Sequence, residues 1–72
     1  MKFDGKKLRI LRKEYGVAAL DVSHRLYSKF GRSITPQAIL AWERGATEPL
    51  YSDILKVANI FKVPTDHFKK ED

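Results

Sequence analysis

Seventy-two residues, 43% of them hydrophobic and with a net charge of +5, are enough for one small domain, and we expect residues 1–72 to form that single domain. The absence of cysteine excludes a disulfide framework and a thiolate metal site. No apolar stretch approaches the length needed to span a membrane, so we expect a soluble, cytoplasmic protein.

The positive charge is concentrated in one half of the chain. Residues 1–34 carry nine Lys and Arg against three acidic residues, whereas residues 35–72 carry five against six. A basic half opposite a near-neutral half is typical of a surface that faces a polyanion. A solvated helix face rich in lysine would account for the charge equally well.

The first predicted helix begins after Asp4, which is a good N-cap residue. Leu8, Leu11 and Tyr15 recur on one side at helical spacing and form its expected inward face. Gly16 ends it.

A second helix is predicted from about Ala18 to Phe30, with Val22, Leu26 and Phe30 as its inward stripe. Its start is weak, because Ala18 occupies the cap position without a side-chain acceptor, which costs about 1 kcal/mol relative to Ser or Thr. Gly31 closes this helix.

The third predicted helix is short, and its start and end can both be read from the sequence. Thr35 is a strong N-cap, Pro36 suits the first helical position, and Gly45 supplies a left-handed residue at the end. Ile34 and Ile39 form the apolar pair that packs across such a cap. A helix of this length is not stable alone, so other elements must hold it.

A fourth helix follows a connecting loop, and a final turn follows the fourth helix. Val63 and Pro64 break the fourth helix, residues 65–68 form one turn that places Phe68 on the core, and residues 69–72 are expected to fray. The helix is predicted from Tyr51 to Phe61, with its inward side formed by Tyr51, Ile54, Leu55, Ala58 and Phe61.

The order of these motifs resembles the Cro/lambda-repressor-like (XRE-type) helix-turn-helix domain along nearly the whole chain. The motifs are Thr-Pro-Gln-Ala-Ile-x-x-Trp-Glu-Arg-Gly, a Glu-Pro loop, Ile-Leu-Lys-Val-Ala-Asn-Ile-Phe and Val-x-x-Asp-x-Phe. The resemblance implies an all-α, five-helix fold in which helices two and three form the helix-turn-helix, here with a lengthened second helix. It also implies a small transcription regulator of phage or mobile-element type in a bacterial host cell, which binds double-stranded DNA without a cofactor.

The resemblance places the third helix in the DNA major groove, with Ile39 and Trp42 facing inward. Gln37 can bond adenine bidentately. The residues expected to read bases are Thr35, Gln37, Ala38, Leu40 and Ala41, with Pro36 also on the groove side. The residues expected to hold phosphates are Lys6, Lys7, Arg9, Arg32, Ser33 and Arg44.

Three departures from the family pattern keep a second hypothesis open. First, Ala18-Ala19 replace the usual Thr-Gln, whose Gln binds a phosphate. Second, about six extra residues lie around Tyr27 to Ser33. Third, Leu40 and Ala41 replace polar and basic residues. The alternative function is an antirepressor that binds a repressor protein through an apolar face containing Leu20 and Leu40. Two structural explanations compete with such a face: the longer second helix buries both leucines, or they are single exposed leucines without a function. That possible partner face consists of Ala18, Ala19, Leu20, Pro36, Leu40 and Ala41.

Catalytic and metal sites are not expected. His24 and His67 lack further ligands at metal-binding spacing, and the sequence contains no arrangement typical of catalysis, so we predict neither an enzyme nor a metal protein. Glu43 and Arg44 are expected to pair locally. Because the sequence ends within a few residues of Phe68, we expect a monomer or a weak homodimer.

Overall fold

The computed structural model describes residues 2–71, and over that range it is built from helices. The elements are α1 (Gly5–Glu14), α2 (Ala19–Phe30), α3 (Pro36–Arg44), α4 (Tyr51–Phe61) and the 3-10 helix η1 (Thr65–Phe68). The predicted all-α class is confirmed, and the fifth helix is a single 3-10 turn. No helix in the described range is both long enough and apolar enough to cross a membrane.

The helix starts follow the predicted caps. The Asp4 carboxylate accepts a hydrogen bond from the Lys6 amide at 3.0 Å, and the Thr35 hydroxyl accepts one from the Ala38 amide at 3.1 Å. The α2 N-cap, Ala18, accepts nothing through its side chain, but its own amide donates to the Asp21 carboxylate at 2.8 Å. Each cap satisfies a backbone group that the first helical turn leaves unpaired.

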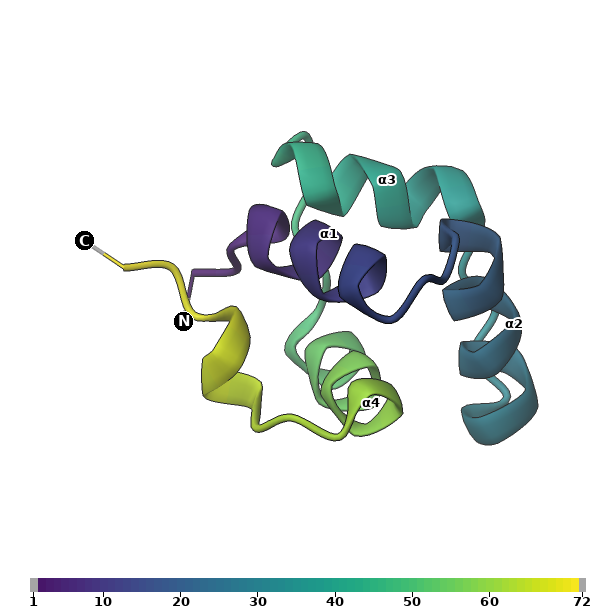
Figure 1. Cartoon of the computed structure of the whole chain (residues 1–72). Coiled ribbons are helices and arrows are strands. Elements are labelled where there is room, and N and C mark those ends of the chain that lie inside the picture. The colour runs from purple at the N-terminus through teal and green to yellow at the C-terminus, as the bar shows by residue number, and fades with distance from the viewer. Residues whose placement is uncertain (1, 72) are drawn as a thin grey trace.

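The helices pack around one core (Figure 1). α3 lies along one edge of the molecule with α1 beneath it, α2 closes one end, and α4 and η1 lie on the side away from α3. Trp42 is buried, as predicted for a core anchor. The side chains that are almost completely buried come from every helix and include Leu8, Val22, Leu26, Ile39, Val57, Phe61 and Phe68.

Part of the predicted core was wrong. Phe30 is 37% exposed, because it ends α2 beyond the reach of α3, and Tyr51 and Leu55 are also exposed. The buried stripe of α4 is shifted from the predicted one, and it includes Asp53 and Val57, which were not predicted to face inward. Tyr15 is exposed too, although its ring packs edge-on against Phe61 with 5.3 Å between centroids.

The two ends of the described chain are joined to each other. Phe3 and Lys69 form an isolated antiparallel bridge, the Asp4 amide donates to the Phe68 carbonyl at 2.7 Å, and the Lys70 amide donates to the Lys2 carbonyl at 2.8 Å. The prediction that residues 69–72 fray is therefore wrong for residues 69 and 70. Asp72 lies outside the described residues.

The first turn of α1 packs directly on the backbone of α3. A Cβ atom on Gly5 would lie 2.1 Å from the Trp42 carbonyl oxygen and 2.7 Å from the Glu43 Cα. Such an approach is open only to glycine. It fixes the N-terminal end of α1 against the C-terminal end of α3.

Candidate nucleic-acid interface

The outer side of α3 presents one exposed stripe. Gln37, Leu40 and Arg44 follow one another at spacings of three and four residues, and all three are exposed. Thr35, at the N-cap, is exposed beside the start of this stripe. The stripe offers an amide, an apolar side chain and a guanidinium to a groove.

The remaining residues predicted on the groove side are less accessible. Pro36, Ala38 and Ala41 are half-buried, while Ile39 and Trp42 on the opposite side are buried, as predicted. The amide of Gln37 is therefore the one exposed polar side chain within α3, apart from Arg44, that can reach a base edge.

A basic hollow of about 510 Å³ lies between the exposed sides of α1 and α3. Arg9 and Lys13 line it from α1, and Leu40 and Arg44 line it from α3. Arg12 and Glu43 also line it, but they neutralise each other. The three remaining side-chain charges are all positive, so this hollow favours an anion beside the exposed stripe of α3.

Arg12 and Glu43 form a buried ion pair between α1 and α3. The Arg12 Nε and Nη2 atoms donate to the two Glu43 carboxylate oxygens at 2.8 and 2.9 Å, and Nη1 donates to the Val17 carbonyl at 3.0 Å. The hydrogen bonds to Glu43, together with its charge, raise the pKa of Arg12 above its usual value despite the opposing effect of burial. The predicted local pair between Glu43 and Arg44 is wrong.

The helical spacing contained a signal for this pair that the sequence reading missed. Glu43 lies four residues after the inward-facing Ile39 and therefore on the same side of α3. A carboxylate on a buried face requires a cation nearby. Arg12, one residue after the buried Leu11, fulfils that requirement.

Arg32, predicted to hold a phosphate, is engaged within the protein. Its Nε and Nη2 atoms donate to the Asp53 carboxylate at 2.8 and 3.2 Å, and the hydrogen bonds and charge of Asp53 raise the pKa of Arg32. Asp53 is 2% exposed and lies on the buried side of α4. The pair ties the chain that follows α2 to α4, and a phosphate would have to compete with a buried carboxylate for the guanidinium.

Lys7 is also partly engaged. Its ammonium donates to the Lys69 carbonyl at 3.0 Å and lies 3.4 Å from a Glu71 carboxylate oxygen. Lys6 and Arg9, the other predicted phosphate-binding residues of α1, are exposed and make no ion pair within residues 2–71. The available charge of α1 thus lies at Lys6, Arg9 and Lys13, of which Lys13 was not singled out from the sequence.

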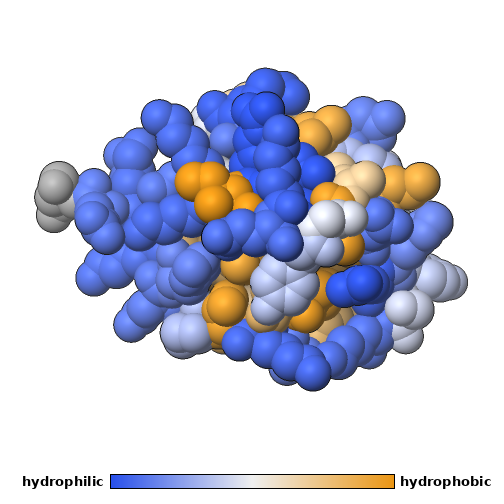
Figure 2. Space-filling view, in the orientation of Figure 1, coloured by the Kyte–Doolittle hydropathy of each residue, from blue (hydrophilic) through white to orange (hydrophobic). Residues whose placement is uncertain are grey.

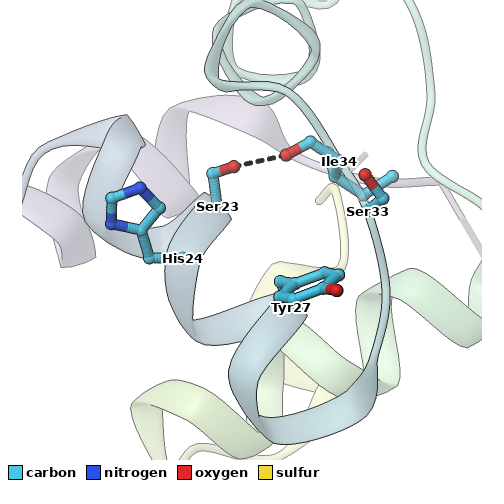
Figure 3. A pocket seen from close by; sticks show the side chains of 5 residues that line it. All are labelled: Ser23, His24, Tyr27, Ser33 and Ile34. Carbon is cyan, nitrogen blue, oxygen red and sulfur yellow. Dashed lines mark hydrogen bonds between the residues drawn. The ribbon is translucent and has the colours of Figure 1, made fainter.

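Ser33 faces α2 (Figure 3). It lines a hollow of about 310 Å³ with Ser23, His24 and Tyr27, and the Ser23 hydroxyl donates to the Ile34 carbonyl close by. The Tyr27 ring lies next to the Ser33 segment, whereas the His24 ring stands apart on the outer side of α2. A phosphate contact by Ser33 stays a prediction.

The apolar face proposed from the sequence is smaller in the structure. Ala19 is buried and therefore not part of any surface, whereas Leu20 is 51% and Leu40 is 40% exposed. The idea that the longer second helix buries both leucines is thus wrong. In the space-filling view, apolar atoms are visible where α3 meets α2, and hydrophilic atoms cover the end at which the termini lie (Figure 2).

No group of three or more His, Asp or Glu side chains within residues 2–71 is placed to hold a metal ion.

Comparison with known proteins agrees with this architecture. A family model described as helix-turn-helix matches residues 8–68, which include α2, α3 and the connection between them. No curated protein and no solved structure matched the chain. The chain therefore belongs to the XRE-type, Cro/C1-like helix-turn-helix family of DNA-binding transcription regulators, whose members are typically not enzymes.

Proposed function

We propose that this protein is a small sequence-specific transcription regulator of phage or mobile-element type, acting in the cytoplasm of a bacterial host, that places α3 in the DNA major groove. Gln37 and Thr35 supply most of the base reading, with Ala38, Leu40 and Ala41 in apolar contact with the groove. Lys6, Arg9 and Arg44 hold backbone phosphates. We expect Lys7 and Arg32 to contribute less, because each is bonded within the protein, and Ser33 to contribute less because it borders a hollow beside α2.

The observation that carries this proposal is the basic hollow beside the exposed stripe of α3. Arg9 and Lys13 reach it from one helix and Arg44 from the other, while the single carboxylate there is bound by Arg12. A row of cations along one side of a recognition helix fits a phosphate backbone that follows the edge of the groove. We expect modest sequence specificity, because Gln37 is the main polar reader.

A salt titration tests DNA binding directly. The intact protein is titrated into fluorescently labelled random-sequence duplex DNA at several salt concentrations, and the affinity is read from anisotropy. If Lys6, Arg9, Lys13 and Arg44 contact phosphates, log K should fall with log salt with a slope of about −3 to −4. Failure to bind at low salt, or binding independent of salt, would reject the proposal.

A second candidate function is that of an antirepressor that binds a repressor protein. It is favoured by the exposure of Leu20 and Leu40, at 51% and 40%. In this reading the two leucines, with Ala18, Pro36 and Ala41, contact the repressor. The protein is then a monomer or a weak homodimer that forms a hetero-complex.

Leu40→Lys discriminates between the two functions. Leu40 lies in the hollow with Arg9, Lys13 and Arg44, so a lysine there adds a further phosphate contact and should tighten DNA binding about 3-fold to 10-fold at low salt. The same change should weaken capture of a repressor, because it places a charge in an apolar contact. Gln37→Ala serves as the control, since it removes base reading without changing charge.

A further inference from the structure

The bridge between the termini places a C-terminal lysine beside the end of α3. Two hydrogen bonds, from Asp4 to Phe68 and from Lys70 to Lys2, hold residues 68–70 against residues 2–4 at 2.7 and 2.8 Å. Successive side chains of extended backbone point in opposite directions. Lys69 and Lys70 are therefore directed differently from this short ribbon, although both border one hollow beside Lys7.

Lys70 lines a hollow of about 170 Å³ together with Lys6 and Arg44. These three residues come from the C-terminal segment, the first turn of α1 and the last turn of α3. Lys69 does not line this hollow; it lines a separate one with Lys7 and Lys70. The joined chain ends thus bring Lys70 to Lys6 and Arg44.

The acidic side chains nearby are largely engaged elsewhere. Glu43 is bound by Arg12 through both carboxylate oxygens, and Glu71 lies beside Lys7. Asp4 lines the hollow and caps the Lys6 amide. Glu43 also lines the hollow, but Arg12 neutralises it. Three cations therefore face the Asp4 carboxylate, and the local charge is positive.

The two helix dipoles at this hollow oppose each other. α1 begins here and α3 ends here, so a partial positive charge from the first offsets a partial negative charge from the second. Each is worth about half an elementary charge. The side chains of Lys6, Arg44 and Lys70 therefore decide the sign of the potential.

We propose that Lys6, Arg44 and Lys70 together bind one backbone phosphate of double-stranded DNA beyond the C-terminal end of α3. This inference rests on the proposed function and extends it. Arg44 lines both this hollow and the larger one formed with Arg9 and Lys13. The two hollows thus form one row of cations along α3, and Lys70 is a DNA contact that a frayed C-terminus would not provide.

The test compares Lys70→Gln with Lys69→Gln. Both variants lose one positive charge from the same segment and keep the backbone hydrogen bonds of the bridge. Lys70→Gln should reduce the steepness of the salt dependence by about 0.9, the value for one lost phosphate contact, and weaken binding several-fold on any DNA sequence. Lys69→Gln should leave the slope unchanged.

Lys56→Gln is a distant control for net charge, because Lys56 lies on α4 with its ammonium 3.4 Å from the Ser52 carbonyl. Equal slopes for Lys70→Gln and Lys69→Gln would overturn the inference while wild-type binding still supports the proposed function. A wild-type protein without salt-dependent DNA binding would instead reject the proposed function itself. Trp42 fluorescence confirms that all variants are folded.

Discussion

Arg12 is a basic residue whose charge is paired inside the protein and is not available to a ligand. Its guanidinium uses three nitrogen atoms to join α1, α3 and the turn at Val17, and its side chain is only 12% exposed. Buried ion pairs contribute little compared with apolar residues of the same shape, but removing one partner leaves an unpaired charge. The pair therefore specifies how α1 meets α3.

Glu43→Met should destabilise the protein by about 3 kcal/mol, because it leaves Arg12 buried without its carboxylate. That loss is a large share of the stability of a small domain, which is on the order of 5 kcal/mol. Urea unfolding followed by Trp42 fluorescence measures it. The double variant Arg12→Met/Glu43→Met should be less destabilised than the sum of the two single variants, and strict additivity would contradict this account.

At the scale of the elements, the start of α2 lacks a side-chain acceptor at its N-cap. Ala18 is its N-cap and accepts no side-chain hydrogen bond, so only Asp21 contributes to the cap, by accepting from the Ala18 amide. Half of the reciprocal capping arrangement is thus present. The missing half is a side-chain acceptor at position 18 for the amide of Asp21.

Ala18→Ser should stabilise the protein by about 0.5–1 kcal/mol, because a serine hydroxyl can accept the amide of Asp21. For a domain of this size, a gain of 1 kcal/mol corresponds to a rise in Tm of roughly 4–8 °C. Thermal unfolding followed by circular dichroism measures the change. Ala46→Ser, in the exposed loop after α3, is the matched control, and an equal effect of both substitutions would exclude a cap as the cause.

For the whole molecule, Phe68 closes the core where the two chain ends meet. It is fully buried, packs against Phe3 with 5.6 Å between ring centroids, and its carbonyl accepts the Asp4 amide. A domain of 72 residues has a small core, so each large buried side chain carries a large share of its stability. Phe68 therefore supports both the fold and the position of Lys70.

Phe68→Ala should cost about 3–5 kcal/mol, enough to unfold much of the protein at 37 °C. Phe30→Ala is the matched control, because Phe30 is 37% exposed at the end of α2 and should cost much less. Urea unfolding of both variants gives the comparison. Similar losses for the two phenylalanines would contradict the assignment of Phe68 as the core residue that joins the termini.

The sequence by itself determined the helices and their ends, because caps and glycines act locally. Asp4, Thr35 and Gly45 each stabilise a helix terminus through backbone groups only a few residues away, and the structure places the helices where these residues predict. Helical spacing also predicted the burial of Leu8, Leu11, Ile39 and Trp42, whereas Tyr15, predicted to face inward, is exposed. The family followed from the combination of motifs.

Only the tertiary structure decided which charged side chains remain available. Arg12 and Arg32 are paired with carboxylates 31 and 21 residues away, and Lys70 lies beside Lys6 across the joined termini. Helical spacing places Glu43 on the buried side of α3, but which cation lies opposite it depends on how the helices pack. The basic half of the sequence predicted a polyanion-facing surface, and packing adds Arg44 and Lys70 from the near-neutral half to its candidate residues.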